Sequence, residues 1–417
     1  MAAEDVWHPS ERWSDAERAG WQDTRLREVV AAVVPHAHAL RERLAAASLN
    51  PADVSVAGLG AVPVLSKDSL PELQRAAPPF GGWLGVPQAA LRSLYRSPGP
   101  ILDPEGTGED YWRFAPALFA AGMRAGDSVL NTLAYHWTPA GHMVAGGLHA
   151  LRCAVVPAGP GNTEIQVTLL AELGIAGFIG TPSFLATVLD AAEAASVMLR
   201  LRTAFVIAEM LSESLRARLE SRFGIRISQG YGTADLGSIA FECTARSGLH
   251  VQREMIVELL DPASGRPVAA GAPGEVVATA LNITYPLLRF GTGDLAAWAE
   301  GPCPCGRSGP RLQRILGRVG DAVKVRGMFL HPAEIELAMA RHPEVARYQI
   351  VVTRSGQSDE MLVRAEVHPD RAAPVDLHER ISRTFSETVR LRGTVEVVPA
   401  GTLPADARKI ADLRTWD

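Results

Sequence analysis

The feature of this sequence that most restricts its fold is an alternation of patterns between about residues 110 and 300. Short apolar runs, each of strand length, alternate with longer stretches of helical spacing such as ESLRARLESRF. The apolar runs are SVLNTLA, CAVVPAG, GFIGT, TAFVIA and IRISQGYG. Strands that alternate with helices favour α/β units around a largely parallel sheet. The pattern therefore predicts an α/β fold.

The sequence on either side of this region has other patterns. Residues 1 to about 50 show helical spacing interrupted at Pro35, and EMIVELLD, GEVVATAL and LAAWAE read as paired strands, which makes the sheet mixed. After ILGRVGDAVKVRG, strand and helix patterns alternate as in a small α+β domain. A chain of 417 residues usually has more than one core. We predict a large N-terminal α/β domain over residues 1–317 and a smaller C-terminal α+β domain over residues 318–417.

Composition excludes several classes of partner. The net charge of -5 gives no reason to expect nucleic acid or an anionic membrane. No apolar run approaches the roughly 20 residues that span a bilayer. The polar, acidic start MAAEDVWHPSERWSDAERAG is unlike a secretory signal. We expect a cytoplasmic protein that acts on small molecules, and a homodimer is compatible with the sequence.

The four cysteines are too few for a disulfide framework. Cys243 and His250 lie in FECTARSGLH, and Cys303 and Cys305 lie in GPCPCGRSGP. Three thiolates and one imidazole are a standard tetrahedral set for structural zinc, so residues 243–305 are a candidate zinc-knuckle region. On these residues alone, separate reduced cysteines and an unrelated histidine are an equally good interpretation. Cys153, inside an apolar run, is interpreted as a core residue.

The segment QGYGTADLG follows the strand pattern IRIS. It would expose backbone at the carboxyl edge of a parallel sheet, where α/β proteins bind ligands. Tyr231 offers a flat face for a base, and Asp235 offers a hard oxygen for magnesium. A glycine turn with a helix cap at Thr233 or Asp235 is the alternative, and in isolation it is favoured.

Two further segments carry polar residues after apolar runs. YPLLRFGTGDL ends at Asp294, whose carboxylate could accept hydrogen bonds from two ribose hydroxyls, although a hairpin turn explains it equally simply. GRVGDAVKVRG supplies Arg318, Asp321 and Lys324, and a solvated basic strand is its alternative.

The stretch YRSPGPILDPEG, residues 95–106, has the small residues and glycines of a phosphate loop. It also has three prolines and no lysine. Proline donates no backbone N–H, so such a loop binds phosphate with few donors. Ser97 and the Gly99 amide are the donors that remain, and a plain surface turn is the alternative.

Taken together and in this order, these segments resemble the adenylate-forming enzymes, in the phenylacetate–CoA ligase-like branch. The resemblance covers nearly the whole chain. The motifs that carry it, besides those above, are GTPSF, AEM, FEC…GLH, CPCGR and GRVGDAVKVRGMFLHPAEIE. It implies an N-terminal domain that binds ATP and a carboxylic acid, a mobile C-terminal domain, and ATP, Mg²⁺, coenzyme A and structural Zn²⁺ as cofactors. In this branch the Cys/His set is a zinc site.

The resemblance also implies a role for each matched residue. Tyr231 and Gly232 would pack by the adenine with Glu209 near its edge, and Asp235 would organise Mg²⁺. Asp294 would bind the ribose and Arg318 the ribose or phosphate. The remaining candidates are Ser97, Gly99, Thr233 and Lys324 for the nucleotide, and Tyr135, His136 and Gly230 for the acid pocket. The segment AYHWTPAGH hints at an aryl pocket, but core packing explains it equally well.

Departures from the family pattern concern the loop, the hinge and one lysine. YRSPGPILDPEG places Asp103-Pro104 near where Lys-Pro would stand. Gly320 occupies a hinge position that is usually aspartate or lysine, within the hinge segment 317–321. Counting from Leu403-Pro404 puts Lys409 at the adenylation lysine, whereas counting back from the final Asp-x-Arg puts Asp406 there. We favour Lys409.

We therefore predict an AMP-forming ligase that activates a carboxylic acid, preferably aromatic, as an acyl-adenylate and transfers it to coenzyme A. One alternative keeps the adenylation and changes the acceptor to an amine or carrier protein, or the acid to an oxyanion such as nitrite. A further alternative is a degenerate nucleotide-binding protein without catalysis, suggested by the altered loop and the ambiguous lysine.

Overall fold

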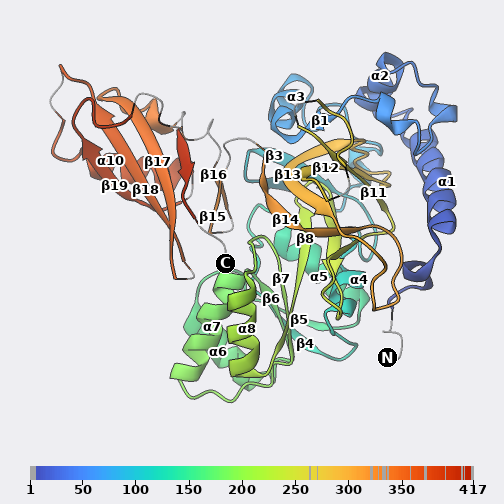
Figure 1. Cartoon of the computed structure of the whole chain (residues 1–417), viewed down its shortest axis with the longest axis horizontal. Helices are drawn as coiled ribbons and strands as arrows, with labels where there is room; N and C mark the ends of the chain where they lie inside the picture. Colours follow the sequence, from blue (N-terminus) through green and yellow to red (C-terminus); the bar gives the residue numbers. More distant parts are fainter. Residues whose placement is uncertain are drawn as a thin grey trace. The chain divides into compact units, whose positions relative to one another are not determined.

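The computed structural model (Figure 1) describes most of the chain. The described residues are 6–262, 264–269, 271–319, 323–326, 328–330, 335, 338–356, 358–370, 373–389, 391–404, 407 and 409–414, without the side chains of 324, 328 and 329. Gly320, Asp321 and Asp406 lie outside them. The chain divides into two compact units, Met1–Leu211 with Arg216–Gly317, and Ser212–Leu215 with Arg318–Asp417. Among the described residues, no helix combines the length and the apolar character needed to cross a bilayer.

Two helices, α1 (Asp15–Val33) and α2 (His38–Ala46), form the N-terminal part. The first begins at a capping box, because the Ser14 hydroxyl accepts from the Glu17 N–H and the Glu17 carboxylate accepts from the Ser14 N–H. Its apolar face, with Leu26 and Val30, is fully buried in the core. The helices flank Pro35, so the predicted interruption is confirmed.

The alternating region forms five parallel strands in the order β8-β7-β6-β4-β5. The strands are β4 (Ser128–Asn131), β5 (Ala154–Pro157), β6 (Gly177–Gly180), β7 (Thr203–Val206) and β8 (Arg226–Thr233). The helices are α4 (Ala115–Ala120), α5 (Ala140–Ala150), α6 (Thr163–Glu172), α7 (Pro182–Ala194) and α8 (Glu213–Phe223). In Figure 1, α6, α7 and α8 lie on one side of these strands and α4 and α5 on the other. Every residue of β6 and β7 is buried, as strands covered on both faces require.

The same sheet continues as antiparallel strands in the order β9-β10-β14-β13-β12-β11. These strands are β9 (Gly237–Glu242), β10 (Leu249–Val251), β11 (Met255–Leu260), β12 (Gly274–Ala280), β13 (Phe290–Trp298) and β14 (Arg311–Arg318). The short β1 (Leu65–Ser66) pairs with β13, and α3 (Leu70–Ala76) packs on a separate hairpin of β2 (Ser93–Ser97) and β3 (Ile101–Glu105). The predicted α/β class with mixed sheets is confirmed.

The second unit has a four-stranded sheet in the order β19-β18-β17-β20. Its elements are β17 (Val345–Ser355), β18 (Ser358–Val367), α10 (Leu377–Thr388), β19 (Thr394–Val398) and β20 (Ile410–Asp412), beside a hairpin of β15 (Val323–Val325) and β16 (Met328–Leu330). Ile381 and Phe385 of α10 are buried in its core. This is the α+β arrangement that the sequence predicts.

Candidate active site

Tyr231 and Asp294, predicted from separate motifs, lie side by side. The Tyr231 hydroxyl, at the carboxyl end of β8, donates to Asp294 Oδ2 at 3.0 Å and lies 3.1 Å from Thr292 Oγ1. Both Tyr231 and Asp294 are more than nine-tenths buried. The structure thus joins the two motifs that the resemblance assigns to the adenosine.

The turn residues around Tyr231 are fixed by close packing. A Cβ at Gly230 would lie 2.3 Å from Cζ of Phe205, and a Cβ at Gly232 would lie 2.4 Å from the carbonyl oxygen of Gly237. Real side chains do not make such contacts, so both positions need glycine. The Thr233 hydroxyl accepts a backbone N–H three residues further on, which closes the turn between β8 and β9.

Glu209, in the loop after β7, lies against the start of α7. Its Oε2 accepts from the Ser183 N–H at 3.3 Å, and Thr181 caps the same helix by accepting from the Phe184 N–H at 3.2 Å. The AEM and GTPSF motifs are therefore adjacent at the carboxyl edge of β6 and β7, the edge at which parallel sheets bind ligands.

Asp235 faces the interior and is paired with a lysine. It lies in the turn between β8 and β9 with a fully buried side chain, and Lys67 Nζ is 2.5 Å from its Oδ2. Lys67 begins the short 3₁₀ helix η4 (Lys67–Ser69) that follows β1. Asp235 Oδ1 is buried and has no hydrogen-bond partner among the described residues.

The stretch predicted as a phosphate loop is the hairpin of β2 and β3. Its turn is Pro98–Pro100, and Gly99 has a φ of +102°, a conformation that favours glycine. Ser97 is buried, and its hydroxyl donates to the Ile101 carbonyl at 3.5 Å. Within the turn, Gly99 has the one backbone N–H that the prolines leave.

Asp103, in β3, extends the buried polar group around Lys67. Its side chain is fully buried, and neither carboxylate oxygen has a hydrogen-bond partner among the described residues. Burial, reinforced by the charge of Asp235, holds the pKa of Asp103 well above its usual range. We call Lys67, Asp103 and Asp235 the buried charge cluster. Sequence reasoning missed Lys67 and Asp103 as site residues, although the resemblance puts Asp103 near the expected position of the family's loop lysine.

An aromatic row joins this hairpin to the loop after β4. The Tyr135 ring lies 4.9 Å from that of His142, which lies 5.3 Å from that of Tyr95, all measured between centroids. Asn131 Nδ2 donates to the Tyr135 hydroxyl at 2.8 Å, and burial raises the pKa of Tyr135 to about 12. His136, also predicted for the acid pocket, is exposed. Sequence reasoning missed His142, although it ends the segment AYHWTPAGH.

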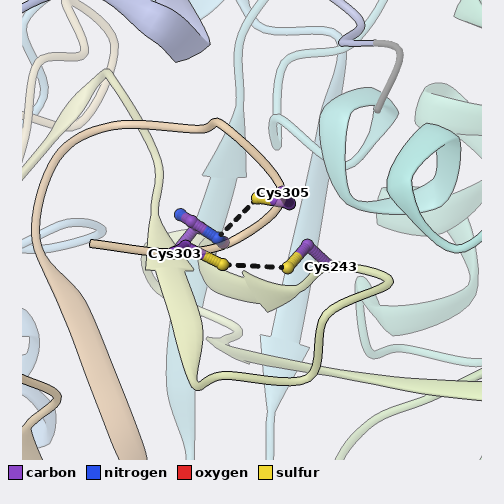
Figure 2. Close-up of side chains that lie close together, drawn as sticks. Cys243, Cys303 and Cys305 are labelled. Atoms are coloured by element: carbon purple, nitrogen blue, oxygen red, sulfur yellow. Dashed lines mark hydrogen bonds between the residues drawn. The ribbon is translucent and has the colours of Figure 1, made fainter. Parts of the chain in front are cut away.

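The four predicted metal ligands form one buried cluster (Figure 2). Cys243 Sγ lies 3.5 Å from Cys303 Sγ, Cys305 Sγ lies 3.5 Å from His250 Nε2, and all four ligand atoms lie within 4.8 Å of one another. A hydrogen bond from Cys243 lowers the pKa of Cys305, and the same contact raises the pKa of Cys243. Zinc–ligand bonds of about 2.0–2.3 Å give tetrahedral edges of about 3.5–3.8 Å, so the spacing fits zinc.

Three predicted residues belong to the second unit or its boundary. Arg318 is the last residue of β14 and is partly buried. Lys324 lies in β15, and its side chain is outside the described part of the chain. Lys409 has an exposed side chain directly before β20, with Nζ 5.8 Å from the centroid of the Tyr348 ring.

Comparison with known proteins shows the family of the chain. The family model for AMP-binding enzymes matches residues 109–284, and the model for their C-terminal domain matches residues 327–414. The phenylacetate-coenzyme A ligase of Thermus thermophilus is 30% identical over 94% of this chain and 96% of its own length. The chain belongs to the phenylacetate–CoA ligase branch of the AMP-binding enzymes.

Other CoA ligases are similar over most of the chain. The phenylacetate-coenzyme A ligase of Aromatoleum evansii is 30% identical over 87% of this chain and 84% of its own length. A crystal structure of 2-hydroxyisobutyryl-CoA ligase with 2-HIB-AMP and CoA has a TM-score of 0.90 at 27% identity, covering 98% of this chain and 92% of that one. These relatives include CoA ligases named for an aromatic acid and one named for a small aliphatic acid.

Proposed function

We propose that this AMP-forming ligase activates an aromatic carboxylic acid with ATP and transfers it to coenzyme A. In the first step the carboxylate oxygen bonds to the α-phosphorus of ATP and pyrophosphate leaves. In the second step the thiol sulfur bonds to the acyl carbon and AMP leaves. The observation that carries the proposal is the near-full-length match to a phenylacetate-coenzyme A ligase. The contact of Tyr231 with Asp294 supports it, because two distant motifs meet where the family binds adenosine.

The proposed nucleotide site lies at the carboxyl ends of β7 and β8. Tyr231 and Gly232 would flank the adenine with Glu209 at its edge, and Asp294 would accept from the ribose hydroxyls. The other proposed nucleotide residues are Ser97, Gly99, Thr233, Arg318 and Lys324. We assign the adenylation lysine to Lys409, whose side chain is exposed.

Asp235 is the proposed ligand for Mg²⁺, which when bound would neutralise phosphate charge. Carboxylate oxygens are the ligands that this ion prefers, and Asp235 Oδ1 has no other partner among the described residues. Lys67 holds Oδ2 of the same carboxylate, so it orients Asp235 and neutralises it in the absence of metal.

The proposed acid pocket includes Tyr135, His136 and Gly230. The row of Tyr95, His142 and Tyr135 rings supports an aromatic acid. The ring of such a substrate can pack against these side chains in an offset-stacked or edge-to-face arrangement. Gly230 packs directly against the Phe205 ring, so this part of the proposed pocket is backbone without a side chain.

The test incubates the purified protein with ATP, Mg²⁺ and coenzyme A and a panel of acids that includes phenylacetate, benzoate and 2-hydroxyisobutyrate. We expect AMP and thioester in equal amounts, with phenylacetate or benzoate the better substrate. AMP without any need for coenzyme A would move the proposal to a different acceptor. No AMP with any acid would refute it.

We also propose that Cys243, His250, Cys303 and Cys305 hold a structural zinc. The closed set of four ligands supports a bracing role, and thiolate ligands suit the reducing cytoplasm, where we place the protein. We expect one zinc per chain by elemental analysis and its loss in Cys243→Ser. Cys153→Ser is the matched control, because Cys153 is a buried cysteine outside the cluster and should keep the metal. Full zinc content in Cys243→Ser would refute the assignment.

A further inference from the structure

A pocket of about 170 Å³ lies behind the Cys/His cluster, and no proposed nucleotide or acid residue lines it. Its walls come from the 3₁₀ helix η1 (Pro9–Arg12), from α1, from the loop before α4, from the turn between β10 and β11, and from the loop after Cys305. The charged residues among its lining are Arg18, Arg113, Arg253, Arg307, Glu11, Asp110 and Glu254.

Two arginines of the lining carry buried N–H groups without acceptors among the described residues. Arg18 is 6% exposed, and its Nε and Nη1 have no hydrogen-bond partner among the described residues. Its guanidinium lies against Gly309, where an added Cβ would come within 2.6 Å of Nε and Cζ. Arg113 uses its two terminal nitrogens on backbone carbonyls, but its buried Nε likewise has no partner among the described residues. Charged donors buried in this way are costly unless an acceptor joins them.

The carboxylates of the pocket are already engaged. Glu11 accepts from Arg307 Nε at 2.6 Å, and Glu254 accepts from Arg253 Nε at 2.8 Å. Asp110 accepts two backbone N–H groups at 2.8 Å each. Four arginines against three carboxylates leave an excess of one positive charge in the lining.

His250 adds a further donor from the direction of the metal cluster. Its Nε2 faces Cys305, so Nδ1 carries the N–H when Nε2 is a ligand. That Nδ1 is buried and has no partner among the described residues, and His250 lines this pocket. A metal-bound histidine almost always donates its second N–H to a carboxylate, a carbonyl or water.

We propose that this pocket binds a small oxyanion, a carboxylate or phosphate group, held by Arg18, Arg113 and His250. One anion balances the excess charge and gives the buried donors their acceptor. It joins α1, the loop before α4 and β10 around one centre, and thereby stabilises the Cys/His cluster from outside.

Selenate provides the direct test, because it is an oxyanion with an anomalous X-ray signal. Crystals of the metal-loaded protein soaked in selenate should show an anomalous peak in the pocket, and Arg18→Gln should abolish it. In solution, inorganic phosphate and sodium acetate are titrated separately against chloride at constant ionic strength, with the thermal midpoint as readout. The two arms decide between a phosphate and a carboxylate ligand.

We expect a saturable rise in midpoint with at least one oxyanion and about a tenfold or greater loss of affinity in Arg18→Gln. Arg222→Gln is the control, because Arg222 is bonded to Glu193 and does not line the pocket, and its affinity should stay within about threefold. Should Arg18→Gln fail to fold, Arg18→Lys keeps the charge and should weaken binding by losing the fork of donors. Unchanged phosphate and acetate affinity in either Arg18 variant, or no selenate peak in the wild type, would overturn the proposal.

Discussion

Two buried ion pairs in the first unit differ in how completely their carboxylate oxygens are bonded. Arg216 donates to both oxygens of Glu242, at 2.8 and 3.0 Å, and the Gln229 N–H adds a further bond at 3.2 Å. Lys67 makes one contact with Asp235, while Asp235 Oδ1 and both oxygens of nearby Asp103 have no partner among the described residues. The first pair therefore matches a bracing role between α8 and β9. The second leaves carboxylate oxygens that can still accept hydrogen bonds or bind a metal ion.

These oxygens lie in segments that we propose for nucleotide binding, the hairpin of β2 and β3 and the turn after β8. Buried polar atoms without partners are costly and persist where function requires them. With two carboxylates and one ammonium, the buried charge cluster has one negative charge in excess. A proton on Asp103 or a metal ion can neutralise it. We infer that Arg216 and Glu242 maintain the fold. We also infer that the buried charge cluster lowers the stability of the fold and takes part in nucleotide binding.

Breaking the pair of Arg216 and Glu242 should have the largest effect on stability. Arg216→Met leaves Glu242 as a buried carboxylate without its cation, so we expect a loss of about 3–5 kcal/mol in the free energy of unfolding by denaturant titration. The double variant Arg216→Met with Glu242→Leu should recover most of this loss. AMP formation per folded molecule should stay near wild type in the double variant. A loss below about 1 kcal/mol in Arg216→Met would contradict a bracing role.

Lys67→Met should lower the free energy of unfolding by about 2–4 kcal/mol in denaturant titration. This is less than for Arg216→Met, because a proton can neutralise a carboxylate that has lost its cation. The loss should be greater at pH 8 than at pH 5. Adding Asp103→Asn to Lys67→Met should restore part of the stability by removing one of the two acids. AMP formation should fall in Lys67→Met even at pH values where it is folded. Activity equal to wild type under those conditions would mean that the cluster has no part in nucleotide binding.

Asp103→Asn should stabilise the protein by about 1–3 kcal/mol at pH 8, since an acceptor-only charge without partners leaves the interior. The sign follows from the raised pKa of Asp103, which burial and the charge of Asp235 cause. Between the ordinary pKa of an aspartate and the raised folded value, the unfolded chain has lost a proton that the folded chain keeps. Wild-type stability therefore falls as pH rises through this window. Denaturant titrations across pH should show this fall in wild type and a smaller dependence of stability on pH in Asp103→Asn. Parallel pH dependences in the two proteins would contradict the role of Asp103.

Tyr231→Phe should have the smallest effect on stability. We expect the free energy of unfolding to fall by about 0.5–1.5 kcal/mol, the net contribution of one hydrogen bond. The substitution removes the contact with Asp294 and leaves the ring in place. We expect KM for ATP to rise several-fold with kcat changed less, in steady-state AMP assays. Tyr111→Phe is the matched control, because its hydroxyl donates to the Pro104 carbonyl and Tyr111 is not one of the proposed nucleotide residues. Equal rises in both variants would show that the effect is structural.

The fold and the cysteine cluster could be predicted from the sequence because their signals are local or chemically rare. Five strand-length runs mark the parallel strands, and Cys303 and Cys305 are two of only four cysteines. Lys67 and Asp103 could not be found in the same way, because lysine and aspartate are common and 36 positions separate them. Only the fold brings η4, β3 and the turn after β8 together. Resemblance pointed to Asp235 but could not show that its carboxylate faces inward to Lys67.

The most direct test of the account is exchange of labelled pyrophosphate into ATP, measured without coenzyme A. An acyl-adenylate that forms reversibly makes this exchange depend on the acid alone. We predict exchange with at least one aromatic acid, none without acid, and a large loss in Asp294→Ala with folding intact. Thioester formation with no acid-dependent exchange, or exchange that survives Asp294→Ala unchanged, would contradict adenylation at this site.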